Sequence, residues 1–228
     1  MKIVLEKCKF IIKIVKYLNL NTLRINFRYF DFFEAIKLPI FLAPNVKILK
    51  LSGSVLINKP IYPGMIRIGY GNVGIFDKDY QRTLLYIEGV IEFDEGVKIG
   101  HGSRISSAKG SLIRFGKNFT ITAHSSIISR FKITFGNDCL LSWDILIMDS
   151  DFHFIKNTAG IPINEDKEII IGDKVWIGCR SIILKGSIIP DNCVIGAQAI
   201  VSSRLSEKNV IYAKCPITIV KKDIYWEK

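Results

Sequence analysis

One polar stretch of the chain, residues 149–168, holds the side chains best suited to acid–base chemistry. It begins with the sequence DSDFH at 149–153. The neutral imidazole of His153 can accept a proton near neutral pH, because the ordinary pKa of histidine lies there. Asp149 or Asp151 could accept a hydrogen bond from the other ring N–H and so hold one tautomer. The alternative is a surface loop in which the aspartates only form turns.

The residues after this stretch repeat every six positions and must form the scaffold that holds it. Residues 171–206 read IGDKVW, IGCRSI, ILKGSI, IPDNCV, IGAQAI, VSSRLS. Neither a helical period nor simple strand alternation accounts for a strict period of six, which is typical of parallel β-helices. The aliphatic column consists of Ile171, Ile177, Ile183, Ile189, Ile195 and Val201. We expect these side chains to point inward and to stack in successive coils.

Two further columns accompany the aliphatic one. Two places before each aliphatic residue stands a small or slim one: Val175, Ser181, Ser187, Cys193 and Ala199. We expect them at corners of a triangular prism, where about three hexads close one coil. The column that follows the aliphatic residues includes Gly172, Gly178 and Gly196. We expect these glycines to permit unusual backbone conformations.

The repeat extends upstream in blocks that are out of phase with one another. Six-residue spacing recurs in Ile87, Phe93, Ile99 and Ile105, in Phe115, Ile121, Ile127 and Ile133, and in Phe135, Leu141 and Ile147. The aliphatic column lapses over 149–168, which predicts a loop extending from the prism. Loops on a rigid scaffold often carry function. A GxGxxG string at 69–74 is not followed by a helical pattern, so we assign it to β turns and not to dinucleotide binding.

Bulk composition restricts the partners. The 228 residues carry a formal net charge of +11, which favours an anionic partner such as a phosphorylated cofactor or an anionic lipid surface. Nucleic acid is not expected, since no zinc spacing, RNA-binding motif or helix-turn-helix pattern is present. The five cysteines include no CxxC pair. They indicate reduced core residues of a cytoplasmic protein, with no disulfide and no metal site.

The first 45 residues differ from the rest and predict an N-terminal helical extension, followed by a β domain over 46–228. Lysines and one glutamate form a single polar stripe over residues 2–18. Such a basic amphipathic helix can lie on an anionic membrane, here the inner membrane face, or pack on its own domain or a neighbouring subunit. Residues 20–45 are aromatic-rich and predict a second short helix and a connector. No transmembrane helix or signal peptide is expected, because Lys13 and Lys16 interrupt the apolar run.

The motifs together resemble the hexapeptide-repeat acyltransferases. The resemblance is carried by VWIGCRSIILKGSIIPDNCVIGAQAIVSS at 175–203 and by the tail IYAKCPITIVKK, and it covers about residues 87–222. RIGYGNVGIFD and LLSWDILIMDSDFH resemble the branch that O-acetylates bacterial surface polysaccharides, alongside maltose and galactoside acetyltransferases. The resemblance implies an all-β solenoid, a left-handed parallel β-helix, assembled as a homotrimer. It also implies acetyl-CoA as the acetyl donor and a sugar hydroxyl as the acceptor.

The resemblance assigns roles to residues of this chain. His153 matches the family's catalytic base, with Asp149 or Asp151 beside it or binding sugar hydroxyls. The residues implied at the cofactor are Trp176, Cys179, Ala197, Ser202 and Lys221, with Lys222 assisting. Trp143 would stack on a sugar or simply pack, and His124 would approach the acceptor or simply face outward. The chain departs from the family at Lys214-Cys215-Pro216, which replaces a Gly-x-Pro turn, and at Thr218, which replaces a basic residue.

Three other functions are compatible with parts of this sequence. An N-acyltransferase acting on an amino sugar of a nucleotide-sugar precursor would use the same coils. A β-helix without catalytic activity would serve assembly or metal binding. A γ-class carbonic anhydrase would need three histidine ligands, two of them about five residues apart, whereas His101, His124 and His153 are separated by 23 and 29 residues. We therefore predict direct acetyl transfer to a sugar hydroxyl without a covalent acyl-enzyme.

Overall fold

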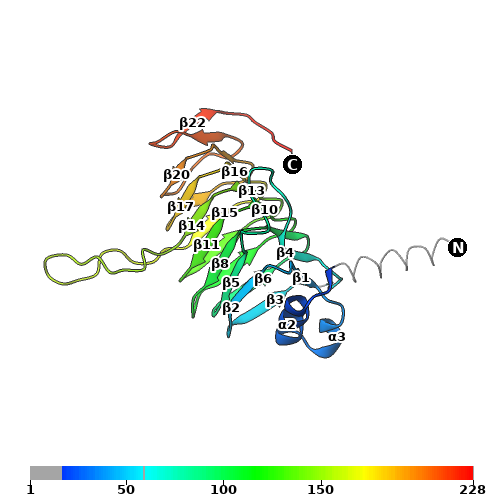
Figure 1. The fold of residues 1–228 in the computed structure, drawn as a ribbon. Helices are drawn as coiled ribbons and strands as arrows, with labels where there is room; N and C mark the ends of the chain where they lie inside the picture. Colours follow the sequence, from blue (N-terminus) through cyan, green and yellow to red (C-terminus); the bar gives the residue numbers. More distant parts are fainter. Residues whose placement is uncertain (1–16, 59, 228) are drawn as a thin grey trace.

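The body of the protein is a stack of β coils with helices at one end (Figure 1). The computed structural model describes residues 17–58 and 60–227. The amphipathic helix predicted over residues 2–18 therefore lies almost wholly outside the described residues. Within the described ranges, each strand up to β17 pairs with the strand three places later in the chain, and β19, β21 and β22 complete the stack. The result is three sheets of nine, seven and six strands. One coil thus contains three strands, as the six-residue repeat predicts.

The sheets are named here A, B and C. Sheet A contains β1 (Ile40–Leu42), β4 (Ile66–Tyr70), β7 (Val97–Gly100), β10 (Thr120–Ala123), β13 (Leu140–Trp143), β16 (Trp176–Ile177), β19 (Val194–Ile195), β21 (Ile211–Ala213) and β22 (Thr218–Lys221). Sheet B contains β2 (Lys47–Leu51), β5 (Leu84–Ile87), β8 (Arg104–Ser107), β11 (Ser126–Ser129), β14 (Leu146–Met148), β17 (Ile182–Leu184) and β20 (Ile200–Val201). Sheet C contains β3 (Ser54–Ile57), β6 (Val90–Phe93), β9 (Leu112–Phe115), β12 (Lys132–Phe135), β15 (Ile169–Ile171) and β18 (Ile188–Ile189). The named pairings are parallel, except that β21 and β22 are antiparallel.

The core is a set of ladders that run from coil to coil. In sheet A, Ile99, Ile121, Leu141, Ile177 and Ile195 are in register and buried. In sheet C the rings of Phe93, Phe115 and Phe135 stack at centroid distances of 5.2 and 5.4 Å. The predicted aliphatic column from Ile171 to Val201 is at most 1% exposed. Its inward orientation is confirmed.

The glycine column has a different role from the one predicted. Gly172, Gly178 and Gly196 do not have positive φ angles; the left-handed corner positions are instead taken by residues such as Arg180 and Gln198. A Cβ on Gly178 would lie 2.6 Å from the backbone nitrogen of Ala197 in the next coil. These glycines are therefore required because adjacent coils approach closely, and the expectation of unusual backbone conformations was wrong.

Gly100 is the tightest of these approaches and provides a test of the fold. A Cβ there would lie 1.9 Å from the carbonyl oxygen of Thr122. Gly100→Ala should therefore lower the free energy of unfolding by about 1–3 kcal/mol, because the coils must separate. Gly74→Ala is the control, since nothing lies within 4 Å of its added Cβ, and it should change stability by less than about 0.5 kcal/mol. Urea denaturation measures both; equal effects would contradict the close coil packing.

Two helices in the described part cap the open end of the stack. These are α2 (Leu20–Tyr29) and α3 (Phe32–Ala35). Buried Asn26 of α2 donates from Nδ2 to the Ile40 carbonyl at 2.7 Å and accepts at Oδ1 from the Ile40 N–H at 3.1 Å. Thr22 does the same for Leu42 through its hydroxyl. The unpaired edge of β1 is thus satisfied by side chains, which blocks further strand addition.

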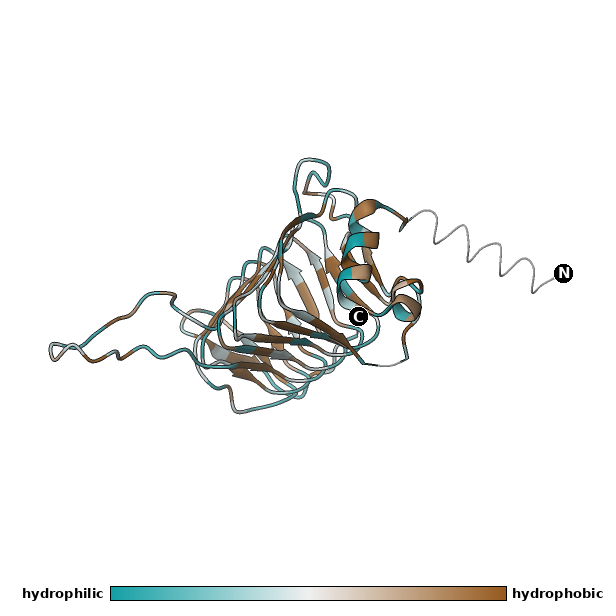
Figure 2. Ribbon diagram, turned by 90° about the horizontal axis from the view of Figure 1, so that it is seen from below, coloured by the Kyte–Doolittle hydropathy of each residue, from teal (hydrophilic) through white to brown (hydrophobic). Residues whose placement is uncertain are grey.

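The segment between β14 and β15 leaves the prism as a long arm (Figures 1 and 2). Its two sides are held by hydrogen bonds from Asn157 N to Ile161 O at 2.9 Å and from Ile163 N to Ile155 O at 2.8 Å. The loop predicted over 149–168 is this arm. The first coil begins at Ile40, ahead of the predicted domain start at residue 46. Among the described residues, no helix is long and apolar enough to span a membrane.

Candidate functional site

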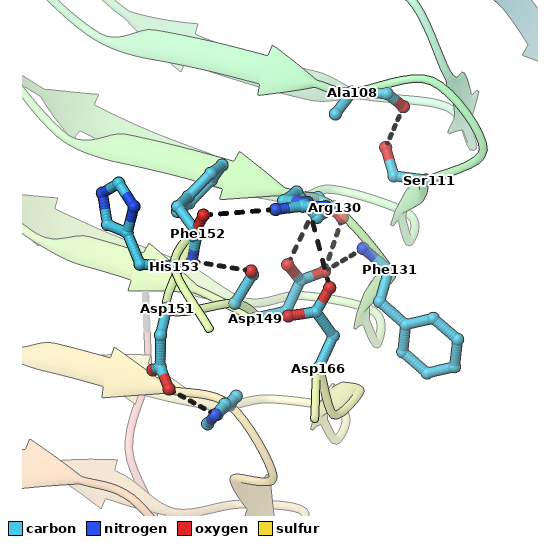
Figure 3. Close-up of polar contacts among 12 residues, drawn as sticks. Ala108, Ser111, Arg130, Phe131, Asp149, Asp151, Phe152, His153 and Asp166 are labelled. Atoms are coloured by element: carbon cyan, nitrogen blue, oxygen red, sulfur yellow. Dashed lines mark hydrogen bonds and ion pairs between the residues drawn. The ribbon is translucent and has the colours of Figure 1, made fainter. Parts of the chain in front are cut away.

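Asp149 anchors the base of the arm. Its carboxylate is fully buried and accepts hydrogen bonds from the Ser129 hydroxyl at 2.6 Å and from the backbone N–H groups of Arg130 and Phe131 at 2.8 and 3.1 Å. Figure 3 shows these bonds converging on the carboxylate from the preceding coil. Both oxygens are therefore occupied by the end of β11, and Asp149 fixes where the arm leaves the prism.

Asp151 ties the arm to the following coil. Its Oδ2 accepts from Lys185 Nζ at 2.5 Å and from Asn164 Nδ2 at 2.7 Å. The hydrogen bond from Lys185, followed by that from Asn164, lowers the pKa of Asp151 below its ordinary value. Asn164 also donates to the His153 carbonyl at 2.8 Å, which joins the two sides of the arm. The backbone near His153 is thus held by Lys185 of the following coil, through Asp151, and by Asn164 across the arm.

The His153 side chain is exposed beside a small cavity. The cavity has a volume of about 230 Å³ and is also lined by Arg130, Phe152 and Asp166. The Arg130 guanidinium lies 5.8 Å from the centre of the Phe152 ring, and its Nε is 3.9 Å from Asp166 Oδ2. The imidazole is positioned on a rigid base and is reachable by a substrate.

The His153 imidazole does not interact with the carboxylates of Asp149 and Asp151 among the described residues. In Figure 3 the His153 ring points away from Asp149 and Asp151. Within the described residues, neither carboxylate forms a hydrogen bond or ion pair with that ring. In this structure, therefore, both aspartates hold the loop in place and neither orients the imidazole.

Three of the predicted binding residues form one column at the corner between sheets A and B. Trp143 ends β13, and Cys179 and Ala197 stand two residues after the ends of β16 and β19. The backbone N–H of Arg180 donates to the Trp143 carbonyl at 3.0 Å, and that of Gln198 donates to the Cys179 carbonyl at 2.9 Å. Cys179 is half-buried and Ala197 is exposed. Trp176 lies nearby on the outer face of β16, 38% exposed, and its Nε1 donates to Ser142 Oγ at 3.1 Å. The column leaves the backbone accessible from outside.

The remaining predicted residues lie elsewhere. Ser202 is exposed after β20, at the corner between sheets B and C from which the arm also departs. Lys221 is exposed at the end of β22, and Lys222 forms an ion pair with Glu207 at 2.7 Å. The turn at Lys214-Cys215-Pro216 connects β21 to β22. In a single chain, His153 and the column of Cys179 therefore belong to different corners of the prism.

His101 and His124 lie side by side, with ring centroids 5.8 Å apart. His101 is 1% exposed, and within the described residues its ring nitrogens have no hydrogen-bond partner. The ring of Phe76 stacks on His124 at 4.1 Å and covers the pair. Burial lowers the pKa of both histidines; His124 and Lys78 lower that of His101 further, and Asp144 partly offsets the effect at His124. Loop 71–82 covers this corner, so His101 is buried and the His124 side chain is only 12% exposed.

The pair makes stability depend on pH. In the unfolded chain these histidines titrate near their ordinary pKa of about 6.5, so below that pH the unfolded state binds more protons than the folded state. Stability should be complete above that pH and should fall as the pH decreases from about 6.5. The His101→Phe variant keeps the ring packing, but its phenyl ring cannot be protonated. Between about pH 7.5 and 5.5 the melting temperature of this variant should therefore fall less than that of the wild-type protein. An unchanged slope in this variant would contradict the role of the pair.

Sequence reasoning did not find three residues that shape the site. Arg130 and Lys185 come from two different coils, after β11 and β17, and Asn164 comes from the far side of the arm. Their only sequence signal is that each departs from the apolar repeat, which many surface residues also do. Within the described part of the chain, no group of three or more histidine, cysteine, aspartate or glutamate side chains is arranged to hold a metal ion.

Comparison with known families identifies the repeat. A family model described as bacterial transferase hexapeptide (six repeats) matches residues 168–203. WbbJ of Escherichia coli K12, named as a lipopolysaccharide biosynthesis O-acetyl transferase, is 30% identical over 154 residues, 62% of this chain and 78% of that protein. The polysialic acid O-acetyltransferase of Escherichia coli O1:K1 / APEC is 31% identical over 138 residues, 58% of this chain but 45% of that protein. The chain thus spans less than half of the latter relative.

A solved structure has the same fold. The crystal structure of the polySia-specific acetyltransferase NeuO superimposes with a TM-score of 0.61 and 21% sequence identity, covering 83% of this chain and 82% of NeuO. At this identity the likeness concerns the fold alone. The predicted fold, a left-handed parallel β-helix of hexapeptide repeats, is confirmed by the repeat match and by this superposition.

Proposed function

The chain belongs to the hexapeptide-repeat acetyltransferases, and from this premise we propose that it transfers an acetyl group from acetyl-CoA to a sugar hydroxyl of a bacterial surface polysaccharide or its precursor. It is an acyltransferase. The observation that carries the proposal is an exposed imidazole, His153, on an arm whose base is held by two buried or bonded carboxylates. Rigid support of this kind keeps a reacting group in productive geometry.

His153 acts as the general base. Acetyl-CoA supplies the acetyl group on a thioester, whose carbonyl carbon the acceptor oxygen attacks. One ring nitrogen of His153 accepts the hydroxyl proton as the new C–O bond forms, and the same nitrogen returns that proton to the departing sulfur. The products are the O-acetyl sugar and free CoA. General-base assistance of this kind contributes about 10²- to 10⁴-fold in rate.

The column at the corner between sheets A and B fits the donor. Cys179 and Ala197 are small, and Gly178 lets the coils approach closely, so backbone N–H and C=O groups lie near the surface where a narrow pantetheine arm can reach them. Trp176 forms one wall. Exposed Lys221 is available for the phosphates of acetyl-CoA, and neighbouring Lys222 adds to the positive charge there.

Assembly as a homotrimer would complete the site. His153 stands at one corner of the prism and the Cys179–Ala197 column at another, so one chain cannot use both at a single point. A threefold arrangement brings the arm of one copy to the column of the next. Each active site would then contain His153 from one chain and the donor wall from its neighbour.

Acetyl transfer to glycans tests the proposal. Purified protein is incubated with acetyl-CoA and with oligosaccharides that offer only hydroxyl groups or also a free amine. The expected result is release of CoA and a product with one added acetyl group that mild alkali removes, because esters are labile to alkali and amides are not. An alkali-stable product would favour N-acylation, and no transfer to any sugar would overturn the proposal.

Mixed oligomers test the shared site. His153→Ala and Ala197→Trp should each be inactive alone, the first without the base and the second with its donor wall blocked. When the two chains are refolded together, activity should return, since some interfaces combine an intact His153 with an intact wall. Light scattering measures the oligomeric state in parallel. Absence of recovery in confirmed mixed trimers would contradict the interfacial site.

A further inference from the structure

A second cavity lies on the outer face of sheet A, near the capped end of the stack. Its volume is about 490 Å³, within the range of ligand sites. Its lining includes Arg67, Lys98 and Thr120 from strands β4, β7 and β10, together with Tyr17 and Tyr70. His153 is not among the lining residues, because the arm leaves from the corner between sheets B and C. The cavity is therefore separate from the cavity at the arm.

Strand register brings the polar residues of this cavity together. Arg67 pairs with Lys98 and Lys98 pairs with Thr120, so the three form a row across the strands. Their neighbours Ile66, Ile99 and Ile121 are buried in the core, which turns the row outward. Adjacent strands are about 4.8 Å apart, so two cationic side chains and a hydroxyl share a patch about 10 Å long.

The cavity carries positive charge without a balancing acid. No aspartate or glutamate is among its lining residues, and within residues 17–58 and 60–227 neither Arg67 nor Lys98 forms an ion pair. Lys132 and Lys185, in contrast, are paired with carboxylates at 3.1 and 2.5 Å. Arg67 is nevertheless held in place: its Nε donates to the Gly64 carbonyl at 3.2 Å and its guanidinium lies 5.8 Å from the centre of the Tyr17 ring.

Aromatic and hydroxyl groups complete the cavity. The rings of Tyr17 and Tyr70 meet edge to face at 5.1 Å, and Tyr70 is fixed by a hydrogen bond from its hydroxyl to the Leu42 carbonyl at 2.7 Å. Thr122, which also lines the cavity, has a buried hydroxyl without a hydrogen-bond partner in the described part of the chain. Aromatic faces, hydroxyl partners and fixed cations are the combination that recognises a charged sugar: rings pack on the apolar faces and cations bind the anion.

The cavity shares a sheet face with the proposed donor wall. Thr120 pairs with Leu140, and Leu140 pairs with Trp176. The row of paired residues therefore continues across the strands, from β10 through β13 to β16. Trp176 is therefore about 10 Å from Thr120, two strand spacings away. A glycan chain lying along sheet A can occupy the cavity with one unit and present another unit near Trp176.

We propose that this cavity is an acceptor subsite for an anionic sugar, with Arg67 and Lys98 binding its carboxylate or phosphate. The inference rests on the proposed function, since it names the class of acceptor that the transferase prefers. The negative charge of the sugar selects the acceptor and holds it along sheet A, while the chemistry takes place at His153.

The test compares acidic with neutral acceptors in the full-length protein. The double variant Arg67→Gln/Lys98→Gln should lower the preference for acidic over neutral oligosaccharides, measured as the ratio of kcat/KM values, by about 10- to 100-fold, because hydrogen bonds to charged groups are lost. Oligosaccharides bearing a carboxylate and oligosaccharides bearing a phosphate are assayed separately, which identifies the anion. Lys47→Gln is the matched control: Lys47 is exposed in β2 of sheet B, and its removal should leave the preference unchanged.

A binding measurement separates this inference from the proposed function. Titration of acidic oligosaccharides by calorimetry should show binding that the double variant loses and Lys47→Gln retains, whether or not acetyl transfer is detected. An unchanged preference and unchanged binding in the double variant would overturn the subsite and leave the transferase proposal standing. Equal losses in Lys47→Gln, or a rise in the KM for acetyl-CoA alone, would also overturn it, since these indicate net charge or donor binding. Melting temperatures verify that the variants are folded.

Discussion

His153→Ala is expected to lower acetyl transfer by about 10²- to 10⁴-fold, which is the usual contribution of a general base. Binding of acetyl-CoA should persist, because His153 is exposed on the arm and the proposed donor wall lies at another corner of the prism. Stability should also persist, since within the described residues the His153 side chain forms no hydrogen bond or ion pair, and Asn164 bonds only to its carbonyl. Steady-state rates with calorimetric titration of acetyl-CoA measure the two properties.

The control is another exposed side chain of the same arm, Lys156. Lys156→Ala should retain nearly all activity, which excludes a general effect of altering the arm. If His153→Ala kept most of its activity, or lost donor binding to the same extent as turnover, the assignment of His153 as the base would be wrong.

Asp149→Ala is expected to lower the free energy of unfolding by about 3 kcal/mol or more, because it leaves buried donors without a partner. The Ser129 hydroxyl and the N–H groups of Arg130 and Phe131 all donate to this carboxylate at 2.6–3.1 Å. The arm would lose its anchor at the same time, so activity should fall even where the protein remains folded. Urea denaturation and the rate of acetyl transfer measure the two effects.

Asp151 provides the matched comparison, two residues along the chain. Asp151→Asn removes a charge from an exposed position and weakens one bond to Lys185. Its effect on stability should be below about 1 kcal/mol, as for other exposed ion pairs. If both variants were equally stable, Asp149 would not be the anchor of the arm.

The fold was predictable from the sequence because the repeat is local. Each hexad contains its own inward residue, so the column from Ile171 to Val201 indicates both the core and the three-strand coil before any long-range contact is known. The arm was predictable for the converse reason, since the apolar column lapses over 149–168. The role of the glycines was not predictable, because it depends on how closely the next coil approaches. A sequence period does not determine that distance.

The candidate site was predictable only in part. The histidine and the small residues Cys179 and Ala197 match a family motif, so their positions along the chain could be named. The hydrogen-bond partners of Asp149 could not be named from the sequence, since Ser129 lies one coil earlier and no local pattern connects the two residues. The low exposure of His101 and His124 likewise depends on Phe76, which loop 71–82 brings over that corner.

By itself, the sequence determined the repeating core, the interruption that becomes the arm, and the chemical type of the exposed base. Only the tertiary structure decided which side chains meet across coils. Asp149 is occupied by β11 and cannot orient His153, the donor column and the arm occupy different corners, and Arg67, Lys98 and Thr120 form one row on sheet A. The physical reason is that parallel coils align by hydrogen-bonded register, while the loops between strands vary in length, so distance along the chain does not indicate which residues become neighbours.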